Sequence, residues 1–276
     1  MPELPEVETV RRGLVKLIKN KTIEQVKVIY PKIVVGDPLE FAQQLQNKKI
    51  ESIGRRGKFL LFNFNQGVTM VSHLRMEGKY FVKSADKPLE KHTHVVFSFT
   101  DGLQLRYNDV RKFGRMQLVK TNSIAQLPNL AKLGPEPLSD QFVLPDFVQK
   151  LANKKKAIKA VLLDQTVVAG LGNIYADEVL WLSKIHPLTP AAKLSVKQIS
   201  VLRQQIITEL TAAVKAGGTT VRSYTDAFEH SGNFQFDLHV YGRQGQPCQR
   251  CGSQIVKIRV AQRGTHFCPN CQQVIK

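Results

Sequence analysis

The sequence predicts an α+β protein: an N-terminal helix with an antiparallel β-sandwich, a helical second lobe and a small C-terminal cysteine module. Three observations lead to this fold class. Residues 23–119 contain short apolar segments separated by turn signals, a pattern typical of antiparallel strands. Beyond residue 140 the apolar positions recur at helical spacing. All four cysteines of the chain lie near its C-terminal end, in two C-x2-C pairs.

The first element begins with the stretch MPELPEVETVRRG. Pro5 is tolerated in a first helical turn, and the acidic residues complement the positive end of a helix. Val7, Val10 and Leu14 recur at helical spacing, so residues 1–20 are predicted to form an amphipathic helix. This reading explains Pro5, but it leaves Pro2 without a role.

The remaining elements follow in order. We expect strands at residues 23–30, 58–64, 68–73, 94–99 and 103–109, with turns at 65–67 and 100–102. Residues 133–140 have the composition of a linker. Helical periods then cover approximately residues 141–152, 155–165, 173–184 and 195–216, and the last is ended by Gly217 and Gly218. The polar, glycine-containing segment 225–233 is predicted to be a mobile loop.

The charge of the chain indicates its partner. With 40 Lys and Arg against 22 Asp and Glu, the 276 residues carry a net charge of +18. A chain this basic usually binds a polyanion, and nucleic acid is favoured over a membrane surface because the cations are dispersed along the sequence. Without an apolar run of membrane-spanning length or a secretory signal, we expect a soluble intracellular protein.

The cysteines have the spacing of a zinc site. Cys248, Cys251, Cys268 and Cys271 form the pattern C-x2-C-x16-C-x2-C. Each C-x2-C pair presents two thiolates to one ion, and four thiolates complete the tetrahedral shell of one structural Zn²⁺. Two disulfides or a redox pair are the alternative, which an intracellular location disfavours.

Between the two cysteine pairs, the segment VKIRVAQRGTHF alternates like two strands around a turn at Gln262, Arg263 and Gly264. Such a ββ zinc finger would hold Arg263 at its tip, where it could contact a phosphate or a reacting group. A solvated turn residue is the alternative.

Other candidate residues have weaker signals. The stretch VVAGLGNIYADEV sets Asn173 at a helix start, either as a phosphate site or as an ordinary N-cap. The basic runs RRGK at 55–58 and KKK at 154–156 bind phosphate or form solvated faces. His73, His92 and His94 lack metal-ligand spacing, so packing or phosphate contacts are the options for them. Spacing alone assigns no functional role to three further residues, which have the character of ordinary core or surface residues: Met76, Arg111 and Phe113.

Pro2 acquires a chemical role if Met1 is removed, as expected before a small residue. The free secondary amine could attack an electrophilic carbon and form an iminium ion, an electron sink for elimination. The positive end of the helix favours the neutral, nucleophilic amine, whereas Glu3 and Glu6 oppose this effect. The carboxylates in turn supply a proton donor beside the reacting carbon.

These motifs together resemble the bacterial formamidopyrimidine-DNA glycosylase family over the whole chain. The matching stretches are MPELPEVETVRRG, GRRGKFL, SHLRMEGKY, DVRKFG, LGPEPLS, VAGLGNIYADEVL, GGTT, VYGRQGQPC and THFCPNC. The resemblance implies a helix-two-turns-helix lobe, a zinc finger and duplex DNA bound between the lobes. It implies excision of 8-oxoguanine and formamidopyrimidines followed by β- and δ-elimination, by a monomeric, cytoplasmic, nucleoid-associated bacterial enzyme.

The resemblance also implies residue roles. Pro2 is the nucleophile toward the sugar C1′, Glu3 the acid and base, and Lys58 and Arg263 bind phosphate and assist elimination. Glu6 is expected close to the lesion. The residues expected to fill the space left by the everted base are Met76, Arg111 and Phe113. The DNA-binding positions are His73, His92, Arg111, Lys156, Asn173 and Tyr241.

The implied domains are a catalytic helix and β-sandwich at 1–132, a helix-two-turns-helix domain at 133–224, a lesion-capping loop at 225–237 and a zinc finger at 238–276. Two alternatives stay open. The related endonuclease VIII branch prefers oxidised pyrimidines, but its members typically begin PEGPE where this chain has PELPE. A DNA-binding zinc protein without enzymatic activity would use Pro2 only as a helix start.

Overall fold

The computed structural model describes residues 1–219 and 232–274, which fall into two compact units. Unit 1 comprises residues 1–131 together with 217–233, and unit 2 comprises 132–216 together with 234–276. The predicted capping loop at 225–237 lies largely outside the described residues. In the described part of the chain, no helix is both long and apolar enough to cross a membrane.

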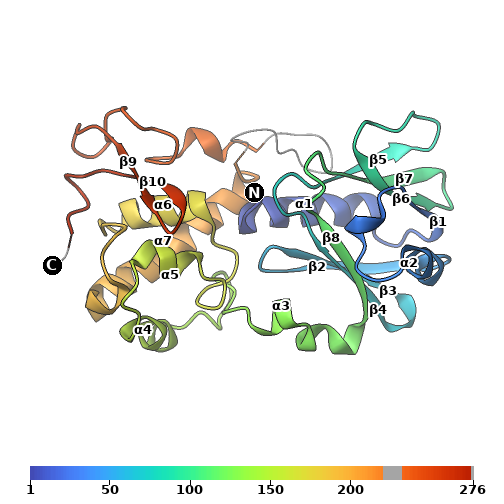
Figure 1. Ribbon diagram of the computed structural model, residues 1–276, viewed down its shortest axis with the longest axis horizontal. Coiled ribbons are helices and arrows are strands. Elements are labelled where there is room, and N and C mark those ends of the chain that lie inside the picture. Colours follow the sequence, from blue (N-terminus) through green and yellow to red (C-terminus); the bar gives the residue numbers. More distant parts are fainter. Residues whose placement is uncertain (220–231, 275–276) are drawn as a thin grey trace. The chain divides into compact units, whose positions relative to one another are not determined.

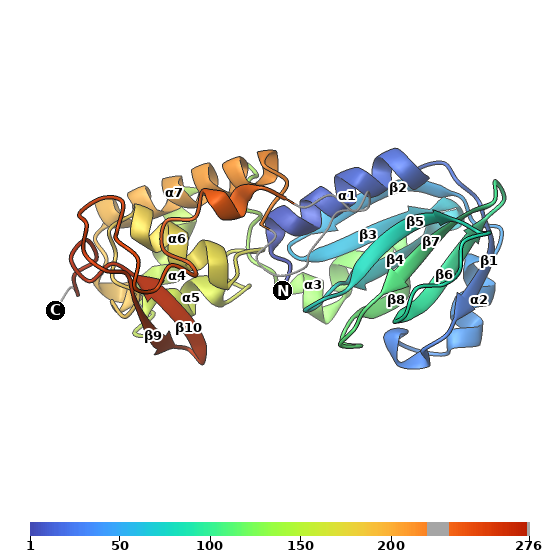
Figure 2. The same ribbon diagram turned by 90° about the horizontal axis from the view of Figure 1, so that it is seen from above.

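Unit 1 is a β-sandwich with a helix along one sheet (Figures 1 and 2). The first sheet has the order β1-β6-β7-β5 and the second β2-β3-β4-β8, and all pairs are antiparallel. Its helices are α1 (Leu4–Ile18), α2 (Pro38–Leu45) and α3 (Pro128–Ala131). The strands are β1 (Ile23–Val28), β2 (Ile50–Arg56), β3 (Phe59–Phe64), β4 (Val68–His73), β5 (Lys79–Ser84), β6 (Thr93–Phe99), β7 (Leu103–Asn108) and β8 (Arg115–Lys120).

The core of unit 1 explains why α1 forms where it does. Val7, Val10, Leu14 and Ile18 are spaced by three or four residues, are buried, and join one apolar cluster with side chains of both sheets. The predicted strands are present, but the sequence pattern did not reveal α2, which interrupts the strand region. Asp37 caps α2 by accepting hydrogen bonds from the backbone N–H groups of Leu39 and Glu40.

The described residues of unit 2 form four α-helices and a β-hairpin. The helices are α4 (Leu144–Ala152), α5 (Ile158–Leu163), α6 (Asn173–Leu182) and α7 (Val196–Lys215), and the hairpin pairs β9 (Val256–Val260) with β10 (Arg263–Phe267). Figure 1 shows this hairpin beside α6. Ser195 and Gln198 form a capping box that begins α7, whose buried stripe includes Ile199, Leu202 and Ile206. The predicted α+β fold, with a two-stranded hairpin near the C-terminal end, is confirmed.

Candidate active site and zinc centre

One end of the sandwich gathers the candidate residues of unit 1. In the second sheet His73 pairs with Phe59 on one side and Arg115 on the other, so β4 ends where β3 and β8 begin. In the first sheet Asn108 pairs with Lys79 and with Thr93. The register therefore brings the turn at 57–58 and the loops at 74–78 and 109–114 to one end of the sandwich.

The helix α1 begins at the same end. Arg11 donates a 3.3 Å hydrogen bond to the Ile53 carbonyl, and Glu8, one turn earlier, forms a 3.3 Å ion pair with Arg55. The earlier residue of the helix therefore contacts the later residue of β2, which means that α1 and β2 run antiparallel. The start of α1 must therefore lie toward the β2–β3 turn, which contains Lys58.

Pro2 directly precedes the cap of α1. Glu3 is the N-cap residue and forms a capping box with Glu6, whose Oε2 accepts a 2.8 Å hydrogen bond from the Glu3 backbone N–H. Pro2, Glu3 and Glu6 are all buried, which is unusual for two carboxylates unless partners hold them. Pro2 is thus joined directly to the N-cap residue at the positive end of a helix, and the first turn of that helix carries two buried acidic residues.

Glu6 also holds the chain that leaves α7. Its Oε1 accepts hydrogen bonds from the Thr219 backbone N–H at 2.8 Å and from the Thr219 hydroxyl at 3.1 Å. Gly218 has φ +76°, and a Cβ there would lie 2.8 Å from Glu6 Oε1. The GGTT motif thus uses glycine because its backbone passes close to Glu6.

Lys58 lies in the tight turn between β2 and β3. Arg56 pairs with Phe59, so Gly57 and Lys58 form a two-residue hairpin turn, and Gly57 has the positive φ of +55° that such turns use. Arg55 donates a 2.8 Å hydrogen bond to the Gly57 carbonyl and fixes the turn. Lys58 is only 6% exposed, which is low for a lysine and indicates that neighbouring residues enclose its side chain.

His73 is held as a neutral imidazole. Burial is the main cause that lowers its pKa to about 3, and the cations of Arg75 and Lys58 add to this effect. Its Nδ1 accepts a 2.9 Å hydrogen bond from the Arg75 backbone N–H, so the proton of the neutral ring must lie on Nε2. His73 can therefore donate one N–H to an oxygen without bringing a positive charge.

The three predicted void-filling residues lie on two loops at this end. Phe113 is 48% exposed, and the guanidinium of Arg111 stacks 4.8 Å from the centre of its ring. Met76, half-buried, lies on the loop after β4. His92 precedes β6 at the same end, with φ +68°, and His94 is buried with its Nε2 2.8 Å from the Asp109 carbonyl oxygen.

In unit 2 the hairpin of the finger is attached to the start of α6. The amide Nδ2 of Asn173 donates a 2.9 Å hydrogen bond to the Gly264 carbonyl. The N-cap of α6 is Gly172, so the alternative of Asn173 as the N-cap is wrong. The predicted turn at 262–264 also needs correction, because Arg263 pairs with Val260 and the turn is formed by Ala261 and Gln262. The exposed Arg263 is the first residue of β10, at the tip of the hairpin.

Two acidic residues of α6 hold neighbouring segments. Asp177 forms a fully buried 2.5 Å ion pair with Lys159 and accepts a hydrogen bond from the His266 backbone N–H. Glu178 accepts hydrogen bonds of 2.7–2.9 Å from the backbone N–H groups of residues 239, 240 and 241. One helix thereby positions Asn173, Arg263 and Tyr241 together. Lys156 lies three residues before Lys159, ahead of α5, and is exposed.

Neither Asp177 nor Glu178 was predicted from the sequence to be a functional residue. A signal existed, because two adjacent carboxylates stand in the middle of a helix that is otherwise apolar in a chain of net charge +18. Buried charges of this kind are retained when paired. Lys159 lies only 18 residues from Asp177, but the backbone N–H groups that the two carboxylates bind lie 61 to 89 residues away in sequence.

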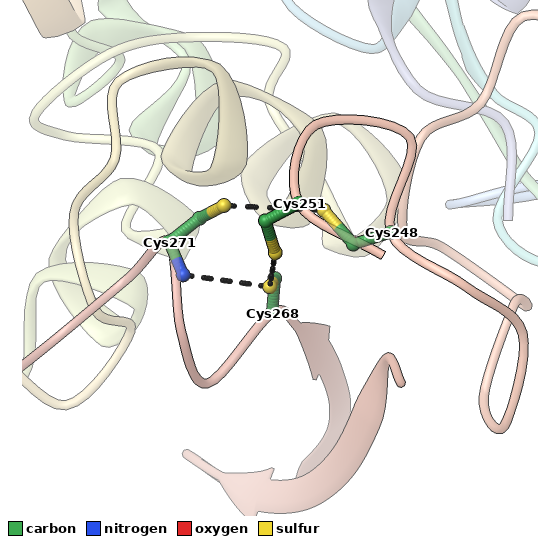
Figure 3. A group of neighbouring side chains, drawn as sticks. All are labelled: Cys248, Cys251, Cys268 and Cys271. Carbon is green, nitrogen blue, oxygen red and sulfur yellow. Dashed lines mark hydrogen bonds between the residues drawn. The ribbon is translucent and has the colours of Figure 1, made fainter. Parts of the chain in front are cut away.

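The four cysteines form one cluster (Figure 3). Their sulfur atoms all lie within 4.8 Å of one another, with Cys251 and Cys268 at 3.5 Å and Cys248 and Cys271 at 4.0 Å. Tetrahedral Zn–S bonds of about 2.3 Å require sulfur separations of about 3.8 Å. These separations are far too long for disulfides, so the cluster fits one Zn²⁺ with no position open to water.

A tryptophan side chain supports this fit. Trp181, on α6, packs in one apolar cluster with Cys248 and Cys268. Burial opposes ionisation of the Cys248 thiol, but hydrogen bonds from the Arg250 backbone N–H and the Trp181 side chain hold the pKa of this thiol below its usual value and favour the thiolate that a metal binds. The Arg250 guanidinium, between Cys248 and Cys251, stacks 3.9 Å from the ring centre and donates a 2.9 Å hydrogen bond to the Trp181 carbonyl.

The fold and the cysteine cluster define a zinc-finger protein of α+β class whose strongly basic chain suits a nucleic-acid partner. Family models match residues 1–116 as the formamidopyrimidine-DNA glycosylase N-terminal domain, 133–225 as the H2TH domain of that family and 245–274 as the zinc finger found in FPG and IleRS. The chain belongs to the formamidopyrimidine-DNA glycosylase family, as the sequence motifs indicated. It is thus a DNA glycosylase and AP lyase of base-excision repair, with a structural zinc finger.

Similar proteins agree over the full length. The formamidopyrimidine-DNA glycosylase of Ligilactobacillus salivarius is 65% identical over 274 residues, covering 99% of each chain, and that of Lactiplantibacillus plantarum is 55% identical over 269 residues, covering 98% of each. The Lactococcus lactis Fpg, solved in complex with abasic-site DNA, matches with a TM-score of 0.94 and 47% identity, covering 98% of this chain and 99% of that one.

Proposed function

We propose that the chain removes 8-oxoguanine and formamidopyrimidines from duplex DNA through an iminium intermediate on Pro2 and then cuts the strand by β,δ-elimination. The observation that supports this most directly is the buried position of Pro2, immediately before the capping box of α1 that the buried residues Glu3 and Glu6 form. The solved Lactococcus lactis relatives include complexes with abasic-site DNA and with Fapy-dG DNA, which supports these substrates.

The first step makes one bond and breaks two. The nitrogen of Pro2, freed from Met1, attacks C1′, and the base leaves with the electron pair of its glycosidic bond and takes a proton. The sugar ring then opens as O4′ leaves C1′ and is protonated, with Glu3 as the acid. The product is an iminium between Pro2 and C1′. Because Pro2 is a secondary amine, this iminium has no N–H proton to lose and keeps its positive charge.

The iminium draws electrons from the sugar. Loss of a C2′ proton expels the 3′-phosphate, and a second elimination expels the 5′-phosphate. Water hydrolyses the remaining iminium and frees Pro2. Lys58 and Arg263 are proposed to neutralise the phosphates and assist these eliminations, because each is a cation built into a tight hairpin end.

The remaining residues are proposed to bind the DNA backbone around the lesion and to fill the space that the everted base leaves. His73 donates a neutral N–H to a phosphate, and an Asn173 amide keeps a second N–H for the same purpose beside the one it gives to Gly264. Tyr241, His92 and Lys156 complete the phosphate contacts, and Glu6 faces the lesion. Met76, Arg111 and Phe113 fill the vacated stack, which offsets the few kcal/mol that base flipping costs.

The proposed organisation follows the predicted domains: 1–132, 133–224, the loop 225–237 and the finger 238–276. The three family-model matches support this division. We further propose that the enzyme acts as a monomer at the nucleoid, since one chain carries every proposed DNA contact.

Borohydride trapping tests the nucleophile. The mature protein should form a covalent adduct with 8-oxoguanine duplex, whereas a chain with Gly-Ser inserted before Pro2 should bind that duplex without forming an adduct. Pro5→Ala is the matched control, because it changes the other proline of the same turn and leaves the Pro2 amine free; its adduct should form normally. An adduct from the Gly-Ser chain that does not map to its new terminal amine would exclude Pro2 as the nucleophile.

A second comparison tests the substrate class. Base release should be faster from 8-oxoguanine than from thymine glycol duplexes. The reverse order would assign the chain the specificity of the endonuclease VIII branch.

A further inference from the structure

The hydroxyl of Tyr107 lies between two glycines of different loops. Tyr107 is the buried penultimate residue of β7. A Cβ added to Gly114 would lie 1.6 Å from this hydroxyl, and one added to Gly78 would lie 2.3 Å from it. Gly78 closes the loop that carries Met76, and Gly114 closes the loop that carries Arg111 and Phe113. One phenol oxygen thus packs against the bases of both loops.

Asp109 fixes the second loop from inside. It is fully buried, its Oδ1 accepts a 3.0 Å hydrogen bond from the Arg111 backbone N–H, and its Oδ2 accepts one of 2.8 Å from the Gly114 backbone N–H. The Tyr107 hydroxyl donates to Oδ2 at 3.3 Å. A single carboxylate therefore joins both ends of the loop to the phenol that also contacts Gly78.

The backbone of Asp109 extends the same contacts to the first sheet. Its carbonyl oxygen accepts a hydrogen bond from the Lys112 N–H and lies 2.8 Å from His94 Nε2, while its own N–H donates to the His92 carbonyl. Lys112 has φ +59°, a backbone conformation that needs support in a residue other than glycine. The loop tip from 111 to 113 is exposed, but its base is held at several points.

We propose that Asp109 and Tyr107 are positioning residues that preorganise the Arg111–Phe113 tip and the Met76 loop for insertion into the DNA stack. The inference rests on the proposed void-filling role of those tip residues. A loop already in its inserted conformation loses less entropy when the base leaves the helix, so more of its contact energy favours base eversion. Asp109 and Tyr107 themselves touch no DNA in this proposal.

The decisive variants are Asp109→Asn and Tyr107→Phe. Asp109→Asn presents an NH₂ group where one backbone N–H now donates, so the loop loses one of its two anchors. Tyr107→Phe keeps the ring that packs 5.1 Å from Tyr80 and removes only the hydroxyl. Asp101→Asn is the matched control, because Asp101 also caps a loop, through Leu103, but precedes β7 at its opposite end.

Three measurements are made on each variant: thermal melting, single-turnover excision of 8-oxoguanine, and cleavage of DNA with a preformed abasic site opposite a gap. A 2-aminopurine beside the lesion reports unstacking. We expect Asp109→Asn to slow excision and unstacking about tenfold, equivalent to about 1.4 kcal/mol. Tyr107→Phe should slow them roughly threefold. Abasic-site cleavage should stay close to the wild-type rate, and Asp101→Asn should behave as wild type.

A double variant that combines Asp109→Asn with Phe113→Ala tests the positioning role of Asp109 separately from the proposed void-filling role of Phe113. If Asp109 acts through the tip, the double variant should be no slower in excision than Phe113→Ala. Effects that multiply, or excision at the wild-type rate in both Asp109→Asn and Tyr107→Phe, would overturn the positioning role. If Asp109→Asn melts early and loses both activities, Tyr107→Phe decides the question alone. A Phe113→Ala variant without selective loss would instead contradict the proposed void-filling function.

Discussion

The side-chain amide of Asn173 donates a 2.9 Å hydrogen bond to the carbonyl oxygen of Gly264, 91 residues away. This bond attaches the residue after Arg263 to the first turn of α6. The buried Lys159–Asp177 pair supports the same junction, since Lys159 Nζ also lies 3.4 Å from the Gly264 carbonyl oxygen. The finger tip is therefore held by the helical part of its own unit.

This relationship predicts coupling between Asn173 and Arg263. Asn173→Ala and Arg263→Ala should each weaken binding to abasic-site duplex about tenfold, since each removes a hydrogen-bonded or charged contact. The double variant should lose less than the product of the two, because Asn173 acts partly by holding Arg263. Arg259→Ala provides the control: it removes another exposed cation of the hairpin, opposite Gly264, and should combine with Asn173→Ala additively. Additive losses for Asn173 and Arg263 would exclude the coupling.

Zinc removal should be visible in the fluorescence of the single tryptophan. Trp181 lies between Arg250 of the first cysteine pair and His239, whose ring stacks 4.3 Å away. A chelator should release the finger, expose Trp181 and shift its emission to the red, while DNA binding falls and zinc restores both. Cys271→Ser should show the shifted emission without chelator. Unchanged emission after zinc loss, verified by metal analysis, would contradict a zinc-held finger.

The salt dependence of DNA binding should report how many phosphates the protein neutralises. Arg263→Ala and Lys58→Ala should each lower the slope of log affinity against log salt by about one unit. Lys19→Ala removes an equal charge at the opposite end of α1 from Pro2 and should leave the slope unchanged. A wild-type slope in Arg263→Ala would mean that this side chain does not neutralise a phosphate.

Glu209 should make the stability of unit 2 fall as the pH rises. Burial raises the pKa of this carboxyl from 4.5 to about 8, and the neighbouring Glu178 and Asp237 add to the shift. Between these two values the folded chain keeps a proton that the unfolded chain has lost, so unfolding becomes easier with increasing pH. Glu209→Gln should remove this dependence and exceed the wild type in stability at pH 8, but not at pH 5.

Urea unfolding followed through Trp181 across this pH range measures the difference. The exposed Glu51→Gln serves as the control and should follow the wild-type profile. Parallel profiles for Glu209→Gln and the wild type would mean that Glu209 is ionised in the folded protein.

Features that depend on local chemistry could be predicted from the amino-acid sequence. Two C-x2-C pairs specify a four-thiolate site wherever the chain folds, and the apolar spacing from Val7 to Ile18 specifies an amphipathic helix. The short segment 68–73, which follows a turn signal, predicts the bounds of β4 to the residue. The family could also be identified from the sequence, because motifs that match it occur in the same order along the whole chain.

Which residues come into contact depends on long-range packing and could not be predicted from local patterns. Strand register brings Lys58, His73 and the loop of Phe113 to one end of the sandwich, and no local pattern encodes that pairing. The roles of Asp109 and Asp177 depend in the same way on donors that folding brings to them. Arg263 falls in β10 because Ala261 and Gln262 accept positive φ angles within a paired hairpin, although Gly264 suggested a later turn. Turn position and buried-charge pairing follow from the lowest free energy of the whole packed unit, which no short segment contains.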